Sequence, residues 1–226
     1  MTSPSRLNAV LTSNMALVML VVVMTIVISA IGDPLRYEVV REGGPIEIAS
    51  AVGYFLCYVL CLFLVRSMQP RMPLSQAWPL LLTLLFLGAR ELDLDKVPFT
   101  KGVLKAKQYT SDDVALGEKL ISLAILILLI VTVVTLIRRF GPGLIRGIRA
   151  GQSHSRAIGL GILFAVLSKS VDGLNRKLEP FGVQVSDETA EWARVFEEVA
   201  ELGIVLAFLQ AVLILKTQQR SEVSQT

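Results

Sequence analysis

The alternation of apolar and charged stretches along the chain predicts six hydrophobic helices. Uncharged, mainly apolar runs of 18 residues, such as residues 72–89 and 120–137, have the length of a membrane-spanning helix. Short segments rich in charged residues, glycine and proline separate these runs. We therefore expect transmembrane helices at about residues 15–31, 48–65, 76–90, 119–137, 157–173 and 198–215.

The composition agrees with a membrane protein. Hydrophobic residues make up 53% of the 226 residues and charged residues 18%, whereas a soluble domain carries about 25% charged residues. This balance excludes a disordered chain and an ordinary soluble domain. The predicted fold class is all-α: a polytopic membrane helix bundle with six transmembrane helices, forming one integral-membrane domain over residues 1–226.

The distribution of charge predicts the orientation of this bundle. Six spans place both termini on one side, and ten Lys and Arg residues fall on that side with a single acid, Glu222. The opposite side receives the remaining 12 bases and 18 acids. Because basic loops stay in the cytoplasm, both termini are predicted to be cytoplasmic. The expected location is a bacterial inner membrane. Loop 91–118 and a helix extension at 186–197 are expected on its extracytoplasmic side.

The fifth and sixth spans are too short unless charged residues join them. Twelve uncharged residues separate Arg156 from Lys169, or roughly 18 Å of helix at about 1.5 Å per residue. Fourteen separate Glu201 from Lys216, or roughly 21 Å. Since the hydrocarbon core is about 30 Å thick, the extracytoplasmic ends of these helices must carry ionisable groups into the membrane.

Other predicted spans bring charged residues to the same outer level, and together they predict a charged pocket that opens outward. Buried ionisable groups in a membrane persist when they pair or line a polar cavity. The candidate catalytic or cation-binding acids are Glu47, Glu91, Asp172, Glu197 and Glu201. The candidate bases for binding an anionic substrate are Arg90, Lys105, Lys119, Lys169 and Arg176.

Each of these residues also has a purely structural explanation. Asp172 and Arg176 are four residues apart and can pair with each other on one helix, and Lys119 can extend to the head groups. Glu197 and Glu201 share a helix face, where like charges repel unless a proton, a cation or a base lies between them.

Three functions are compatible with such a pocket. The first is binding or processing of a lipid or lipid-linked anionic substrate. The second is a small proton- or cation-coupled transporter or channel, with Glu201 and Asp172 as titrating groups. The third is a non-catalytic assembly or sensor subunit, with the face around Trp192 as the contact. The sequence does not decide whether the protein is an enzyme.

Cofactors and partners follow from the residue types. Carboxylates without histidine or thiolate partners favour a hard divalent cation, and there is no signal for haem, zinc, a nucleotide or nucleic acid. Membrane lipids are expected partners, and the basic segment 138–156 either binds their head groups or only sets the topology. The small residues Ala157, Gly161 and Ala165 predict a helix-packing seam, within the bundle or towards a homo-oligomer or membrane partner.

Overall fold

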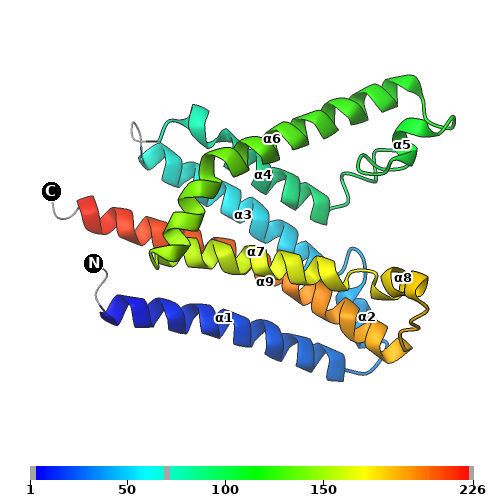
Figure 1. Ribbon diagram of the computed structural model, residues 1–226, viewed down its shortest axis with the longest axis horizontal. Coiled ribbons are helices and arrows are strands. Elements are labelled where there is room, and N and C mark those ends of the chain that lie inside the picture. Colours follow the sequence, from blue (N-terminus) through cyan, green and yellow to red (C-terminus); the bar gives the residue numbers. More distant parts are fainter. Residues whose placement is uncertain (1–3, 69–71, 224–226) are drawn as a thin grey trace. The chain divides into compact units, whose positions relative to one another are not determined.

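The computed structural model describes residues 4–68 and 72–223, which are helical apart from short connections (Figure 1). The elements are α1 (Pro4–Ala30), α2 (Leu35–Val40), α3 (Pro45–Ser67), α4 (Leu74–Glu91), α5 (Lys107–Thr110), α6 (Leu116–Arg149), α7 (Ser153–Val171), α8 (Leu174–Leu178), the 3₁₀ helix η1 (Glu179–Phe181) and α9 (Asp187–Val223). No strand occurs among the described residues, so the all-helical fold class is confirmed.

Several of these helices are long and apolar enough to cross a membrane. Four segments meet this requirement: Ser13–Ala30, Leu35–Ser67, Leu116–Arg149 and Asp187–Gln219. A fifth is added if α7 and the helical segment after it form one bent span. Helix α4 is not among them, because charged residues end it and several polar residues begin it. The helices are compatible with a multi-pass membrane protein.

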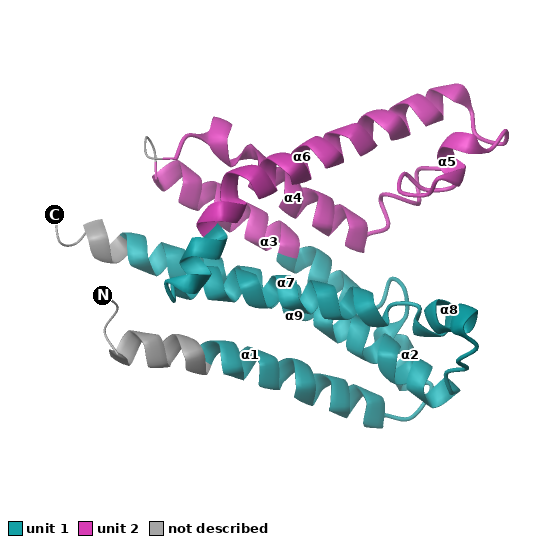
Figure 2. Ribbon diagram, in the orientation of Figure 1, with its two compact units in different colours: residues 1–53, 144–226 teal, residues 54–143 magenta. Residues whose placement is uncertain are grey.

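The chain divides into two compact units (Figure 2). Unit 1 contains residues 1–53 and 144–226, and unit 2 contains residues 54–143. The divisions fall inside α3 and inside α6. Each unit has its own buried side chains, and each is described by itself below.

Unit 1 is built on the pairing of α7 with α9, and α1 packs on α9 as well (Figure 1). Small residues permit the close approach. A β-carbon added to Gly161 on α7 would lie 2.8 Å from Phe208 Cε1 on α9, and one added to Gly203 would lie 2.9 Å from Val21 Cγ2 on α1. Because lipid is as apolar as these side chains, such close packing holds membrane helices together.

The predicted seam on α7 therefore contacts α9 within this chain. Ala157 and Gly161 are buried, whereas Ala165 is half-buried. A homo-oligomer or a membrane partner formed through the seam stays a prediction.

Unit 2 combines the rest of α3 with α4, α5 and most of α6. Tyr54, Cys57 and Leu84 are among its buried residues, and Gly88 on α4 lies against Tyr54 and Phe55 on α3. The segment between α4 and α6 forms turns around the single-turn helix α5. Buried polar side chains hold that segment, as described below.

Candidate functional site

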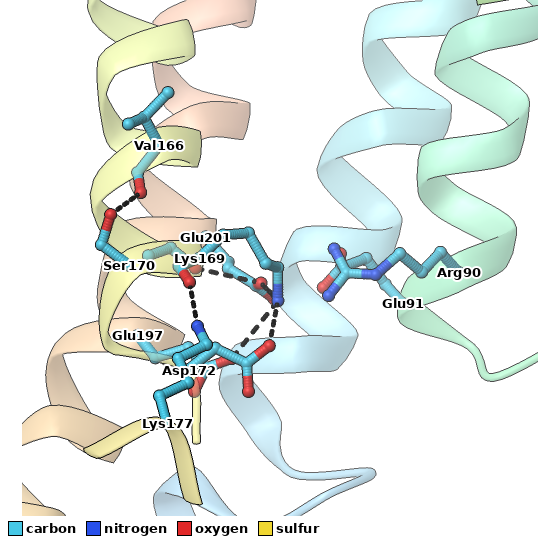
Figure 3. A network of polar contacts seen from close by, with 10 residues as sticks. Arg90, Glu91, Val166, Lys169, Ser170, Asp172, Lys177, Glu197 and Glu201 are labelled. Atoms are coloured by element: carbon cyan, nitrogen blue, oxygen red, sulfur yellow. Dashed lines mark hydrogen bonds and ion pairs between the residues drawn. The ribbon is translucent and has the colours of Figure 1, made fainter. Parts of the chain in front are cut away.

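Lys169 on α7 lies among three carboxylates in unit 1 (Figure 3). Its Nζ is 2.9 Å from Glu201 Oε1, 3.3 Å from Glu197 Oε1 and 3.3 Å from Asp172 Oδ2. Glu197 and Glu201 come from adjacent turns of α9, so the base lies against the helix face on which they would otherwise repel. We call these four residues the Lys169 cluster.

The cluster extends from the surface into the interface between α7 and α9. Lys169 and Asp172 are more than one-third exposed as side chains, Glu197 is half-buried, and Glu201 is only 8% exposed. The buried hydroxyl of Ser168 donates to Glu201 Oε1 at 3.2 Å. Three carboxylates thus share one ammonium within the cluster.

A break in the helix positions the outer part of the cluster. Helix α7 ends at Val171, and Gly173 has φ +59°, a conformation that glycine adopts without strain. The helical segment that follows is bent by 68° relative to α7. Lys177 donates from Nζ to the carbonyl oxygen of Lys169, which satisfies one of the carbonyl groups left open at the end of a helix.

This break corrects one sequence-based expectation. Asp172 and Arg176 do not share a continuous helix, because α7 has ended and α8 begins only at Leu174. Asp172 pairs with Lys169 instead. The exposed Arg176 guanidinium lies over Gly173, with Nη2 3.0 Å from the position of an added β-carbon.

Other charged residues near the same ends of the unit 1 helices form separate contacts. Arg36 bridges Asp33 at 2.9 Å and Glu191 of α9 at 2.6 Å. Glu47, a predicted site residue, accepts a hydrogen bond from the Gly43 backbone at the start of α3. The sequence does not predict the ion pair between Arg36 and Glu191, because nothing in the local sequence signals a pairing across 155 residues.

The remaining predicted residues belong to unit 2. Arg90 Nη1 lies 3.6 Å from Oε1 of the buried Glu91. Lys105 is exposed in the segment before α5, and Lys119 is half-buried in the first turn of α6. The structure thus brings together four of the ten predicted residues, Lys169, Asp172, Glu197 and Glu201.

A second polar network, absent from the sequence-based prediction, lies in unit 2. The fully buried Gln108 donates to Glu118 Oε1 at 2.8 Å and to Ser122 Oγ at 3.0 Å, and it accepts from the Lys101 backbone at 2.9 Å. Uncharged side chains such as Gln108 give no charge or periodicity signal, so sequence reasoning has no means of finding it.

Two hydrogen bonds from the neighbouring Tyr109 complete this network. Its hydroxyl donates to the Val103 carbonyl at 2.6 Å and to the Ser122 carbonyl at 3.3 Å. Desolvation raises the pKa of Tyr109 above its usual value. The loop between α4 and α6 is therefore a fixed structure anchored to the first turns of α6.

The donor set of the Lys169 cluster limits its chemistry. In the described part of the chain, no three or more His, Cys, Asp or Glu side chains are arranged to hold a metal ion. The position between the carboxylates is filled by an ammonium group. Protonation of a carboxylate in such a cluster weakens its attraction for the ammonium.

No family model, curated protein or solved structure matches this chain.

Proposed function

We propose that this protein is a multi-pass protein of a bacterial inner membrane, with one integral-membrane domain, six spans and both termini in the cytoplasm. The separation of basic and acidic residues supports six spans. If α4 did not cross, the basic residues Arg66 and Arg71 would share a side with the acidic stretch that follows α4. That arrangement would break the rule that basic loops remain in the cytoplasm.

Labelling of introduced cysteines tests the orientation. Asp112→Cys and Ser153→Cys place a thiol in the predicted outer loop and in the predicted cytoplasmic turn. A membrane-impermeant maleimide added to intact cells should label the first and not the second. Cys57 and Cys61 are buried and serve as the internal background. Labelling of both introduced thiols, or only of the second, contradicts the orientation.

We infer that the Lys169 cluster is the outward-facing proton- or cation-binding site of a small transporter or channel. This inference rests on the excess of carboxylates over ammonium groups around the buried acid Glu201. Ionisable groups persist within membrane helices when they pair with each other, and they often mark proton or ion pathways. When a carboxylate binds a proton, its attraction for Lys169 weakens and the ammonium can shift towards the remaining acids.

An anionic lipid or lipid-linked substrate is the second candidate. Lys169, the base that would bind it, is already shared by three acids, which repel an anion. The observation in favour is the position of Arg176, exposed beside the break after α7. A phosphate held there would lie at the rim of the cluster, outside its carboxylates.

Proton flux into proteoliposomes tests the first candidate. Purified protein is reconstituted, a pH gradient or a potential is imposed, and an entrapped pH-sensitive dye reports proton entry. Glu201→Gln should abolish or strongly reduce the flux, and Lys169→Gln should change its pH dependence. Glu188→Gln, which removes an exposed carboxylate from the first turn of α9, is the matched control and should leave the flux unchanged.

The outcomes separate the candidates. Wild-type flux in Glu201→Gln, or no flux in the wild type, rejects the transporter. Retention of an anionic lipid that is lost in Arg176→Gln would then support the second candidate. Variants that affect neither flux nor lipid retention leave an assembly or sensor subunit as the remaining function.

A further inference from the structure

The turn between α6 and α7 carries a basic surface at the opposite end of α7 from the Lys169 cluster. Lys169 lies 13 positions after Arg156, or roughly 20 Å along the helix. Within residues 145–156, which we call the basic turn, Arg146 and Arg149 are exposed and Arg156 is half-buried. The basic turn contains no acid, and neither does the wider segment 138–156.

Close backbone packing fixes the shape of this turn. A β-carbon added to the buried Gly147 would lie 2.2 Å from Ser155 Oγ, so only glycine fits there. The Gln152 amide donates to the Gly147 carbonyl at 2.8 Å. Gly151 has φ +75°, and the Arg156 guanidinium lies over it, with Nη2 3.1 Å from the position of an added β-carbon. Arg156 is thus held against the turn that also carries Arg149.

Apolar side chains accompany these bases. Ile145 is 53% exposed and Ile148 is 38% exposed, and they alternate with Arg146 and Arg149 at the end of α6. Ile148 of α6 lies against Gly159 of α7. Exposed isoleucines beside arginines suit the boundary between head groups and acyl chains, whereas a nucleic acid or an acidic peptide would leave the isoleucines in water.

We propose that the basic turn binds the head groups of anionic phospholipids in the adjacent leaflet. Arginine forms paired, charge-assisted hydrogen bonds with phosphate oxygens, and each base near an anionic membrane surface strengthens binding. The isoleucines lie among the first acyl-chain carbons. This site does not depend on the Lys169 cluster or on the function proposed for it.

Titration of single lipids onto the full-length protein in mild detergent, followed by native mass spectrometry, tests this proposal. The probes are phosphatidylglycerol and the neutral phosphatidylcholine. The wild type should bind phosphatidylglycerol more tightly than phosphatidylcholine, and added salt should weaken the preference. The variant Arg149→Gln/Arg156→Gln should bind phosphatidylglycerol about 25-fold more weakly, since each base near the surface contributes about fivefold. The variant Arg149→Lys/Arg156→Lys should retain most of the preference.

Two further variants keep the test decisive. Lys96→Gln/Lys107→Gln removes the same charge from exposed positions of unit 2 and should behave as the wild type. Arg149→Gln alone changes only an exposed side chain, so it tests the site even if the Arg156 replacement disturbs the turn; about a fivefold loss is expected. The proposal is overturned if the wild type shows no preference for phosphatidylglycerol. It is also overturned if the preference is unchanged in both glutamine variants.

Discussion

Replacement of Lys169 by glutamine tests whether the Lys169 cluster is one electrostatic unit. The change removes the only ammonium among three carboxylates. The companion change, Glu201→Gln, removes one carboxylate charge but keeps an oxygen that can accept from Ser168. Lys169 then retains Asp172 and Glu197 as partners.

The expected cost follows from the burial of the partners. Removal of one member of a buried ion pair costs about 3–5 kcal/mol, and an exposed pair is worth only about 0.2–1 kcal/mol. Glu201 is buried, but the Lys169 side chain is 44% exposed. We therefore expect Lys169→Gln to lower the free energy of unfolding by about 2 kcal/mol. Glu201→Gln should cost less than about 1 kcal/mol.

Unfolding in mixed micelles of mild and denaturing detergent measures the change in the free energy of unfolding for both variants. Circular dichroism follows the helices. In a Trp78→Phe background, the fluorescence of Trp192, five residues before Glu197 on α9, follows the local structure. The double variant Lys169→Gln/Glu201→Gln should be more stable than Lys169→Gln alone. At acidic pH, protons neutralise the carboxylates in place of the ammonium, so the defect of Lys169→Gln should shrink.

Two results would refute this reasoning. The first is a Lys169→Gln variant no less stable than Glu201→Gln at neutral pH. The second is a Lys169→Gln defect of the same size at acidic and neutral pH. Either result would mean that the ammonium contributes little to the balance of charge around Glu201.

Three further predictions concern packing and the segment between α4 and α6. Gly53→Ala should destabilise the protein by about 1–3 kcal/mol, because the new methyl group would lie 2.2 Å from Val205 Cγ1. Gly117→Ala, with open space around the new methyl group, should be neutral or stabilising in the same unfolding assay. Gln108→Ala leaves buried partners unsatisfied and should cost about 1–3 kcal/mol; hydrogen exchange should quicken between α4 and α6 and stay unchanged in α7 and α9. Tyr109→Phe should cost about 1 kcal/mol. Because burial raises the pKa of Tyr109, the wild type should lose more stability than the Phe variant above the unfolded-state pKa of about 10, as alkaline titration will measure.

The helical class could be predicted from the sequence because long apolar runs are a strong, local signal. The charges that gather around Lys169 could also be anticipated, because runs of 12 and 14 uncharged residues are too short to cross the membrane alone. The pairing itself could not. The contacts of Lys169 with Glu197 and Glu201 depend on how α7 packs on α9. Its contact with Asp172 depends on the break at Gly173, and a single glycine after a helix gives no angle for the segment that follows.

The network around Gln108 could not be predicted for a different reason. Its members are polar residues from a loop and from α6, joined by hydrogen bonds over separations of 7 to 14 residues. Hydropathy and charge patterns report on which segments are buried, and they carry no information about which polar side chains meet. The contact between Arg36 and Glu191 is hidden in the same way.

The division of the chain also fixes an order of assembly during synthesis. Residues 54–143 are contiguous, so unit 2 is complete once the ribosome has passed α6. Unit 1 is discontinuous: α1 and the start of α3 are made before unit 2, whereas α9, on which α1 packs, is made after it. Since chains emerge from the N-terminus, the long helices α3, α4, α6 and α7 are all made between α1 and its partner α9. Helix α1 therefore gains its contacts with α9 only after the whole of unit 2 has been made.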